Sequence, residues 1–205
     1  MARRGYCVLL ALLTVTSAFA AGGCARSSPV RYYVLNPLAE APTQVGAPAQ
    51  ATGRLLVEYA MLPKYLDRPQ IVVHQSRHEV RPLEFHRWAE PLKDGLTRVL
   101  AENLAALLPA WQIITPTDAT RMEFDGTLRV RVIRLHAGGG EVRTVVEWHI
   151  RANKDRIAAI PVRRAEYHEV LDSDDPSQLI AAFDRGILAL SKEIAAALAQ
   201  PGAVR

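Results

Sequence analysis

Residues 128–150 read LRVRVIRLHAGGGEVRTVVEWHI, and the two alternating runs in this stretch decide the fold. Apolar Leu128, Val130 and Val132 alternate with arginines, and the alternation then slips by one residue, which predicts a β-bulge near Val132. Beyond the glycine turn, the second run places these side chains on one face: Val142, Thr144, Val146, Trp148 and Ile150. The stretch therefore predicts an antiparallel hairpin with one face in the core and the other in water.

Further strands are expected on both sides of this hairpin. β-Branched and aromatic composition places them at 32–35, 54–61, 70–75, 80–85, 111–115 and 162–170. The last of these is expected to extend the hairpin into a larger sheet. Pro82 has no backbone N–H to donate, so we expect its strand to lie at a sheet edge or to contain a bulge.

A first amphipathic helix is predicted to begin at the sequence WAEP, residues 88–91, with Pro91 in the first turn, and to end near Pro109. Its apolar residues recur at helical spacing, so one stripe faces a core. Gly95 inside the helix weakens it by about 1 kcal/mol relative to alanine. We therefore expect the helix to pack closely against a neighbour at this position.

A second amphipathic helix is predicted at the C-terminal end. It opens with DPSQ at 175–178, which has the form of a capping box, and Pro201 ends it. Two such helices and a set of strands predict an α+β fold. We expect a largely antiparallel or mixed sheet with both helices packed on one face.

The N-terminus has the parts of an export signal. Arg3 and Arg4 are followed by an apolar run at 7–19, which is shorter than the roughly 20 residues that span a bilayer. The sequence AFA at 18–20 fits ordinary signal peptidase, whereas AGGC at 21–24 resembles a bacterial lipobox, with alanine where leucine is usual. We expect residues 1–23 to be a signal peptide.

Cys24 is expected to carry a lipid. The chain has two cysteines and Cys7 lies in the leader, so the mature chain has no disulfide. A thioether-linked diacylglycerol, with an N-acyl chain such as palmitate, removes the reactive thiol and gives a stable anchor. The alternative is cleavage before Ala21, with one unmodified thiol. Residues 24–53 are expected to form a lipid-anchored tether and residues 54–200 the folded domain.

Composition and motifs do not favour catalysis or nucleic-acid binding. The formal charge is +4, and +2 without the two leader arginines, which is too small to indicate nucleic acid. The sequence has no G-x-S-x-G or H-E-x-x-H motif. His74 and His78 lie in strand or turn sequence, where a spacing of four does not give helical metal geometry. Helix capping explains the acidic run Asp172, Asp174 and Asp175. We expect no enzymatic activity, no metal and no cofactor other than the covalent lipid.

Three strings carry a family resemblance. They are LPKYLDRPQIV at 62–72, FHRWAEPL at 85–92 and VLAENLAALLP at 99–109, and they follow a lipobox and the segment YYVL at 32–35. Together they closely resemble the auxiliary lipoproteins of ABC-type transport systems, the family that includes the outer-membrane lipoprotein of the Pqi operon. The resemblance runs from about residue 32 to residue 198.

This resemblance implies recognition rather than chemistry. Such lipoproteins act with inner-membrane transporter components and a periplasm-spanning MCE-domain protein in intermembrane lipid transport, and support envelope integrity. The resemblance implies a homo-oligomeric docking component, lipid-anchored on the periplasmic face of the outer membrane. The alternative hypothesis is a periplasmic carrier that binds a lipid in its own apolar cleft. The helical stripes each match one sheet face and require no spare cavity, which favours docking.

Candidate contact residues lie in two of the three strings. Tyrosine and arginine are enriched at interface hot spots, so we consider a partner or oligomer contact formed by Tyr65, Leu66, Asp67, Arg68, Arg87, Trp88 and Glu90. In the alternative interpretation, Tyr65 and Leu66 lie in the core while Asp67 and Arg68 hydrogen-bond the turn. Trp88 and Glu90 then only stabilise the start of a helix.

A second candidate surface is a basic face on the hairpin. It is formed by Arg129, Arg131, Arg143 and Arg151, and acidic lipid headgroups or an acidic partner surface would match it. In the alternative interpretation this is a solvated sheet face, on which the arginines form cross-strand pairs with residues such as Glu141 and Glu147.

Overall fold

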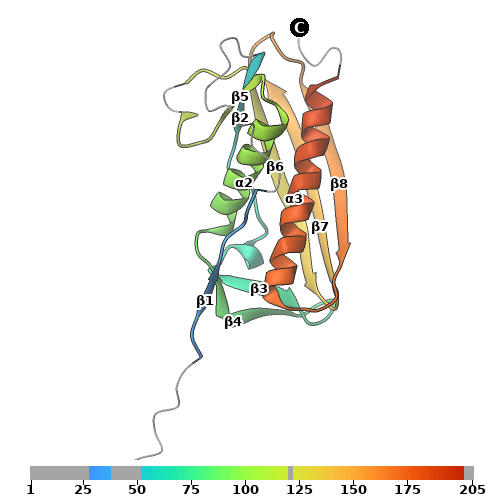
Figure 1. Ribbon diagram of the computed structural model, residues 1–205. Coiled ribbons are helices and arrows are strands. Elements are labelled where there is room, and N and C mark those ends of the chain that lie inside the picture. The colour runs from blue at the N-terminus through green and yellow to red at the C-terminus, as the bar shows by residue number, and fades with distance from the viewer. Residues whose placement is uncertain (1–27, 38–51, 120–121, 201–205) are drawn as a thin grey trace, which may run out of the picture.

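The computed structural model of the protein describes residues 28–37, 52–119 and 122–200. The predicted signal peptide, Cys24 and most of the predicted tether lie outside these residues. The described elements are β1 (Arg31–Tyr33), β2 (Gly53–Val57), the 3-10 helix η1 (Lys64–Leu66), β3 (Gln70–His74), β4 (Val80–Trp88), α2 (Leu92–Leu107), β5 (Trp111–Ile114), β6 (Gly126–Gly138), β7 (Glu141–Ala152), β8 (Ile160–Val170) and α3 (Pro176–Leu198). They form an α+β fold, as the sequence predicts (Figure 1).

The larger of two sheets is built around the predicted hairpin. Its strand order is β5-β2-β6-β7-β8, with β6, β7 and β8 antiparallel and β2 parallel to both β5 and β6. The register of β6 against β7 shifts between Val132 and Arg134, which confirms the predicted bulge. Gly139 and Gly140 form the turn at φ values of 67° and 78°, which glycine adopts without steric cost.

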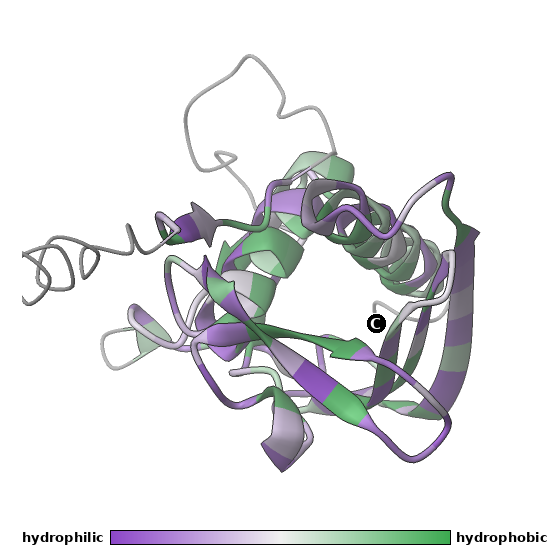
Figure 2. Cartoon of the chain, turned by 90° about the horizontal axis from the view of Figure 1, so that it is seen from below, coloured by the Kyte–Doolittle hydropathy of each residue, from purple (hydrophilic) through white to green (hydrophobic). Residues whose placement is uncertain are grey.

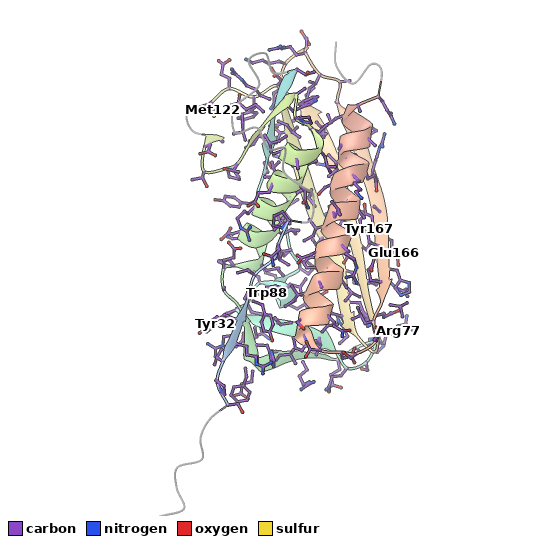
Figure 3. All side chains as sticks on the ribbon, in the orientation of Figure 1. Tyr32, Arg77, Trp88, Met122, Glu166 and Tyr167 are labelled. Atoms are coloured by element: carbon purple, nitrogen blue, oxygen red, sulfur yellow. The ribbon has the colours of Figure 1, made fainter. Side chains whose placement is uncertain are left out.

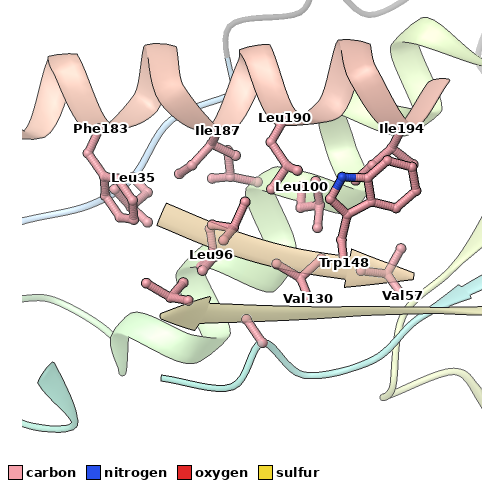
Figure 4. Close-up of a cluster of buried hydrophobic side chains, with 14 of the residues drawn as sticks. Leu35, Val57, Leu96, Leu100, Val130, Trp148, Phe183, Ile187, Leu190 and Ile194 are labelled. Atoms are coloured by element: carbon pink, nitrogen blue, oxygen red, sulfur yellow. The ribbon is translucent and has the colours of Figure 1, made fainter. Parts of the chain in front are cut away.

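Helices α2 and α3 both cover one face of this sheet (Figure 1). The core between the helices and the sheet contains Trp148 of β7. Its side chain is fully buried beneath Leu190 and Ile194 of α3 (Figure 4). The indole Nε1 of Trp148 donates to Glu193 Oε1 at 3.1 Å, and the Tyr167 hydroxyl donates to the other oxygen of that carboxylate at 2.8 Å. One glutamate of α3 therefore joins β7 and β8.

The two helix starts differ in how well they are predicted. Asp175 caps α3 as expected, because its side chain accepts a hydrogen bond from the Ser177 N–H at 2.8 Å. Helix α2 begins at Leu92 rather than at Trp88, which is the last residue of β4. Pro91 is the N-cap with an extended ψ of 129°, and the residue before a proline is sterically disfavoured in the α region.

A smaller sheet, of order β1-β4-β3, lies across one end of this layered body (Figure 2). Strand β1 pairs in parallel with the last three residues of β4, while β3 pairs with β4 antiparallel. Strand β4 is central rather than at an edge, and the second predicted possibility, a bulge, is the one observed, because the register against β3 shifts between Gln70 and Val72. Pro82 itself lies beside a register irregularity and outside the part of β4 that pairs with β1, so its missing donor is tolerated.

Candidate docking site

Residues from two of the three strings that carry the family resemblance meet in one surface groove of about 370 Å³. One wall is formed by Asp67, Arg68 and Pro69 after η1, and the other by the segment 88–92, which joins β4 to α2. Four predicted contact residues therefore lie together: Asp67, Arg68, Trp88 and Glu90. The groove joins charged rims to the apolar surface of a half-buried tryptophan, which is the usual composition of a protein contact site.

The first wall is held by the residues just before it. The Tyr65 hydroxyl donates to the Leu135 carbonyl at 3.2 Å and accepts from the Leu135 N–H at 3.3 Å, so η1 is fastened to β6. Leu66 is 3% exposed and belongs to the core. These two predicted contact residues thus face the interior, whereas Asp67 and Arg68 are exposed. The tucked part of the loop fixes the position of the exposed part.

The second wall is fixed by backbone and ion-pair contacts. The Trp88 N–H donates to the Pro69 carbonyl at 2.7 Å, which joins the two walls directly. Glu90 accepts from Arg98 at 2.7 Å, and this bond, as the largest cause, raises the pKa of Arg98. A Cβ on Gly95 would lie 3.0 Å from Glu90 Oε1. Gly95 therefore gives the Glu90 side chain room to fold over the first turn of α2, which explains a glycine inside a helix.

The segment after β1 is fastened next to this site. Leu35 is 1% exposed, and its carbonyl accepts from Arg98 at 2.9 Å. The Asn36 N–H donates to Asp184 Oδ1 of α3 at 3.1 Å. Asp184 is 5% exposed, and burial raises the pKa of its carboxyl to about 6. Sequence reasoning missed this contact, although an aspartate beside Phe183 in an apolar helical stripe was a signal for it.

Arg87 stands apart from the other predicted contact residues. It pairs with Tyr32 of β1, while its neighbour Trp88 pairs with Tyr33. Because successive residues of a strand point to opposite faces, Arg87 lies on the face of the small sheet opposite to Trp88. The seven predicted residues therefore divide between the interior, the groove and the outward face of the small sheet.

A family sequence model covers most of this chain. The sequence model of the ABC-type transport auxiliary lipoprotein component matches residues 33–195. The chain belongs to this family. The match begins within β1, so the family domain includes the segment that Arg98 and Asp184 hold.

This auxiliary lipoprotein is also similar to a curated protein. It is 28% identical over 130 residues to the intermembrane transport lipoprotein PqiC of Escherichia coli (strain K12). The aligned region covers 60% of this chain and 68% of the relative. The PqiC of Shigella flexneri matches to the same extent.

Solved structures share the fold. A crystal structure of an uncharacterized protein superposes with a TM-score of 0.68 at 22% identity, over 84% of this chain and all of the other. Protein XCC0632 from Xanthomonas campestris gives a TM-score of 0.62 at 17% identity, over 80% of this chain and 92% of the other. At these identities the likeness concerns the fold alone.

The predicted basic face of this auxiliary lipoprotein is largely paired with carboxylates. Arg129 binds Glu58 through two hydrogen bonds of 2.6 and 3.2 Å, and Arg131 binds Glu147. Arg143 contacts both Glu141 and Glu166, at 3.4 and 3.5 Å. Arg151 is exposed and forms no ion pair with the described residues. Three of the four arginines thus have an acidic neighbour.

Other polar features of the auxiliary lipoprotein do not assemble into a chemical site. Within residues 28–37, 52–119 and 122–200, no three His, Cys, Asp or Glu side chains converge as metal ligands. His74 contacts His136 rather than His78, with ring centroids 4.4 Å apart. A polar depression of about 590 Å³ runs past Arg81 and Asp174, and it includes none of the predicted contact residues. No helix in the described part of the chain is long and apolar enough to cross a bilayer.

Proposed function

We propose that this protein is the docking component of an MCE-type intermembrane lipid transport system and has no catalytic role. Two strings of the sequence meet in an open groove with charged rims and a tryptophan, and this observation carries the proposal. PqiC of Escherichia coli, to which the chain is similar, is an intermembrane transport lipoprotein, and this similarity supports the same class of function. The groove is the surface that a periplasm-spanning MCE-domain protein would contact.

The sizes of the internal cavities favour docking over lipid carriage. The apolar cavity between α3 and the small sheet holds about 20 Å³, and the cavity beneath the middle of α3 about 10 Å³. Ligand pockets typically measure roughly 300–1,000 Å³. An acyl chain does not fit into either cavity without separating α3 from the sheet. Among the described residues, the space between α3 and the sheets is therefore packed, and we do not favour the carrier hypothesis.

Anchoring and assembly complete the proposal. Diacylglycerol and an N-acyl chain on Cys24 would hold the chain on the periplasmic face of the outer membrane, and copies of the chain would form a homo-oligomeric platform for the partner. Inner-membrane transporter components would complete the system, which would support envelope integrity. An intact mass of the membrane-extracted protein tests the anchor, because acylation adds the lipid mass to a chain that begins at residue 24.

The docking role is tested by reversing charges in the groove. Asp67→Arg with Arg68→Glu keeps the net charge and exchanges the two exposed rim charges. The matched control is Arg164→Glu with Glu166→Arg, two exposed positions on β8. Each variant is co-purified with the MCE-domain protein from membranes. We expect the groove variant to recover at least 10-fold less partner, which corresponds to about 1.4 kcal/mol, and the control to match the wild type.

Two outcomes would count against docking. Equal recovery of the partner by the groove variant and the wild type would remove the groove from the contact. Stoichiometric lipid in the purified protein, beyond the acyl chains on Cys24, would favour the carrier hypothesis instead. Lipid extraction followed by mass spectrometry measures the second outcome.

A further inference from the structure

The outward face of the small sheet is apolar where a solvated strand is normally polar. Along β1 and its flanks, the side chains of Val30, Tyr32 and Val34 are exposed, and that of Tyr32 is 64% exposed. The intervening Tyr33 is half-buried and Leu35 is buried. The segment therefore alternates with apolar residues on both faces. A strand with one face in water usually alternates apolar with polar residues, so the outward face is suited to contact another apolar phase.

Strand β4 extends this face. Arg31 pairs with His86 and Tyr32 with Arg87 in a parallel register, so Phe85 lies one strand across from Val30. Phe85 is exposed. Val80 adds exposed apolar surface at the start of β4, beyond the register shift and outside the part of β4 that pairs with β1. Among the described residues, five of the nine exposed large apolar side chains belong to this sheet and its flanks; the other four are Tyr59, Met61, Val162 and Val170. The apolar exposure is thus concentrated at one end of the molecule.

Arg87 adds a cation to the same face. It lies beside Tyr32 in the register, and its Nε is buried with no hydrogen-bond partner among the described residues. No carboxylate in the described part of the chain forms an ion pair with its guanidinium. Of the eight arginines on the strands of the large sheet, four pair with a carboxylate. Arg87 is half-buried, which leaves its terminal N–H groups for a phosphate group.

The position of this face relative to Cys24 indicates what covers it. The chain enters β1 at the end of the body where the small sheet lies (Figure 1), and Tyr32 lies on the outer side of the body there (Figure 3). Val30 is six residues after Cys24, and six residues span at most about 21 Å when fully extended. An anchor on Cys24 therefore confines this end of the molecule to the neighbourhood of the lipid headgroups.

We propose that the outward face of the small sheet rests in the headgroup layer of the leaflet that holds the acyl chains of Cys24. Tyrosine favours this layer because its ring is apolar and its hydroxyl is polar, and valine and phenylalanine bury their side chains against the upper acyl chains. Arg87 binds a lipid phosphate. The inference depends on the proposed lipidation of Cys24, and it assigns the body a fixed orientation in which one sheet faces the membrane.

The mature chain offers a direct test because Cys24 is its last cysteine. In the acylated full-length protein, Phe85→Cys supplies a single thiol for an environment-sensitive NBD label, with Val34→Cys as a second labelling site. Val162→Cys is the matched control, because it is an exposed position at the start of β8. Each labelled protein is reconstituted in vesicles of phosphatidylethanolamine and phosphatidylglycerol at 3:1. Intact mass first establishes that Cys24 is acylated, so a failed anchor is distinguished from a failed contact.

We expect the emission at positions 85 and 34 to shift to the blue and to intensify in vesicles, with no change at position 162. Adding Tyr32→Ser to the Phe85→Cys protein should remove most of the shift. A water-like emission at both sites in acylated protein would overturn the inference. A blue shift that grows with protein concentration without vesicles would also overturn it, because the face would then be covered by a second copy of the chain.

Discussion

The outward faces of the two sheets differ in composition, because one is charged and the other is largely apolar. On the large sheet, Arg131 pairs with Glu147 and Arg143 with Glu166 on neighbouring strands, so charges of both signs alternate across strands and neutralise one another. On the small sheet, valine and tyrosine are exposed, and Arg87 beside Tyr32 forms no ion pair with the described residues. On the outward face of the large sheet, the charged groups pair with one another, so this face is stable in contact with water. The outward face of the small sheet leaves apolar surface and a cation unsatisfied, so it is the face with more to gain from a contact.

Both faces belong to one folded body, and the largest expected effect is the loss of stability when the core of that body is disrupted. Trp148→Ala removes a fully buried indole beneath α3 and should lower the free energy of unfolding by about 3–5 kcal/mol. Trp88→Ala, at the half-buried tryptophan beside the small sheet, is the matched control and should cost about 1–2 kcal/mol. Urea denaturation followed by circular dichroism measures both. Equal losses would mean that the small sheet is as deeply built into the core as the large one.

A second prediction concerns the segment that carries β1 into the small sheet. Burial raises the pKa of Asp184 to about 6, above the value of about 3.9 in an unfolded chain. The folded protein therefore retains a proton that the unfolded chain releases between these pH values. Stability should fall as the pH rises from about 4 to about 6 and then remain constant. This is the reverse of the usual behaviour of a salt-bridged aspartate.

Asp184→Asn should remove this pH dependence. The amide cannot ionise and still offers an oxygen to the Asn36 N–H, so the variant should be more stable than the wild type at pH 7 by up to about 3 kcal/mol. The difference should vanish below pH 4. Asp184→Ala also cannot ionise but loses the acceptor, so its gain should be smaller. Thermal denaturation from pH 4 to 8 distinguishes the three proteins, and parallel curves for Asp184→Asn and the wild type would contradict the prediction.

The features that the sequence predicts well are those set by neighbouring residues. The hairpin at 128–150, its bulge near Val132 and the Asp175 cap all depend on side-chain alternation or on a local hydrogen bond. The cross-strand pairs of Arg131 with Glu147 and of Arg143 with Glu166 follow from the same alternation. Each can be inferred within a window of about 25 residues, because the partner lies on the adjacent strand or the next turn.

The features that sequence analysis missed join distant segments. Residues 32–35 show strand character, but their partner in β4 lies more than fifty residues away, and no local pattern indicates the pairing. The division into two sheets and the contact of Asn36 with Asp184 depend on the same tertiary packing. The groove is an intermediate case. Residue types predict that both of its walls form contacts, but they do not predict that the walls adjoin. That proximity is seen in the hydrogen bond from the Trp88 N–H to the Pro69 carbonyl.

The smallest expected effect comes from the paired face. A double-mutant cycle of Arg131→Ala and Glu147→Ala should give a coupling of about 0.2–1 kcal/mol, because an exposed ion pair gains little over hydration of its two charges. Since Arg164 also approaches Glu147, the Glu147→Ala change should cost more than the Arg131→Ala change. Raising the salt concentration should shrink the coupling further, because exposed pairs are screened.

Neither variant should alter the NBD emission at position 85 in vesicles. A loss of the blue shift in Arg131→Ala would place the membrane against the large sheet and reverse the orientation inferred from the two faces.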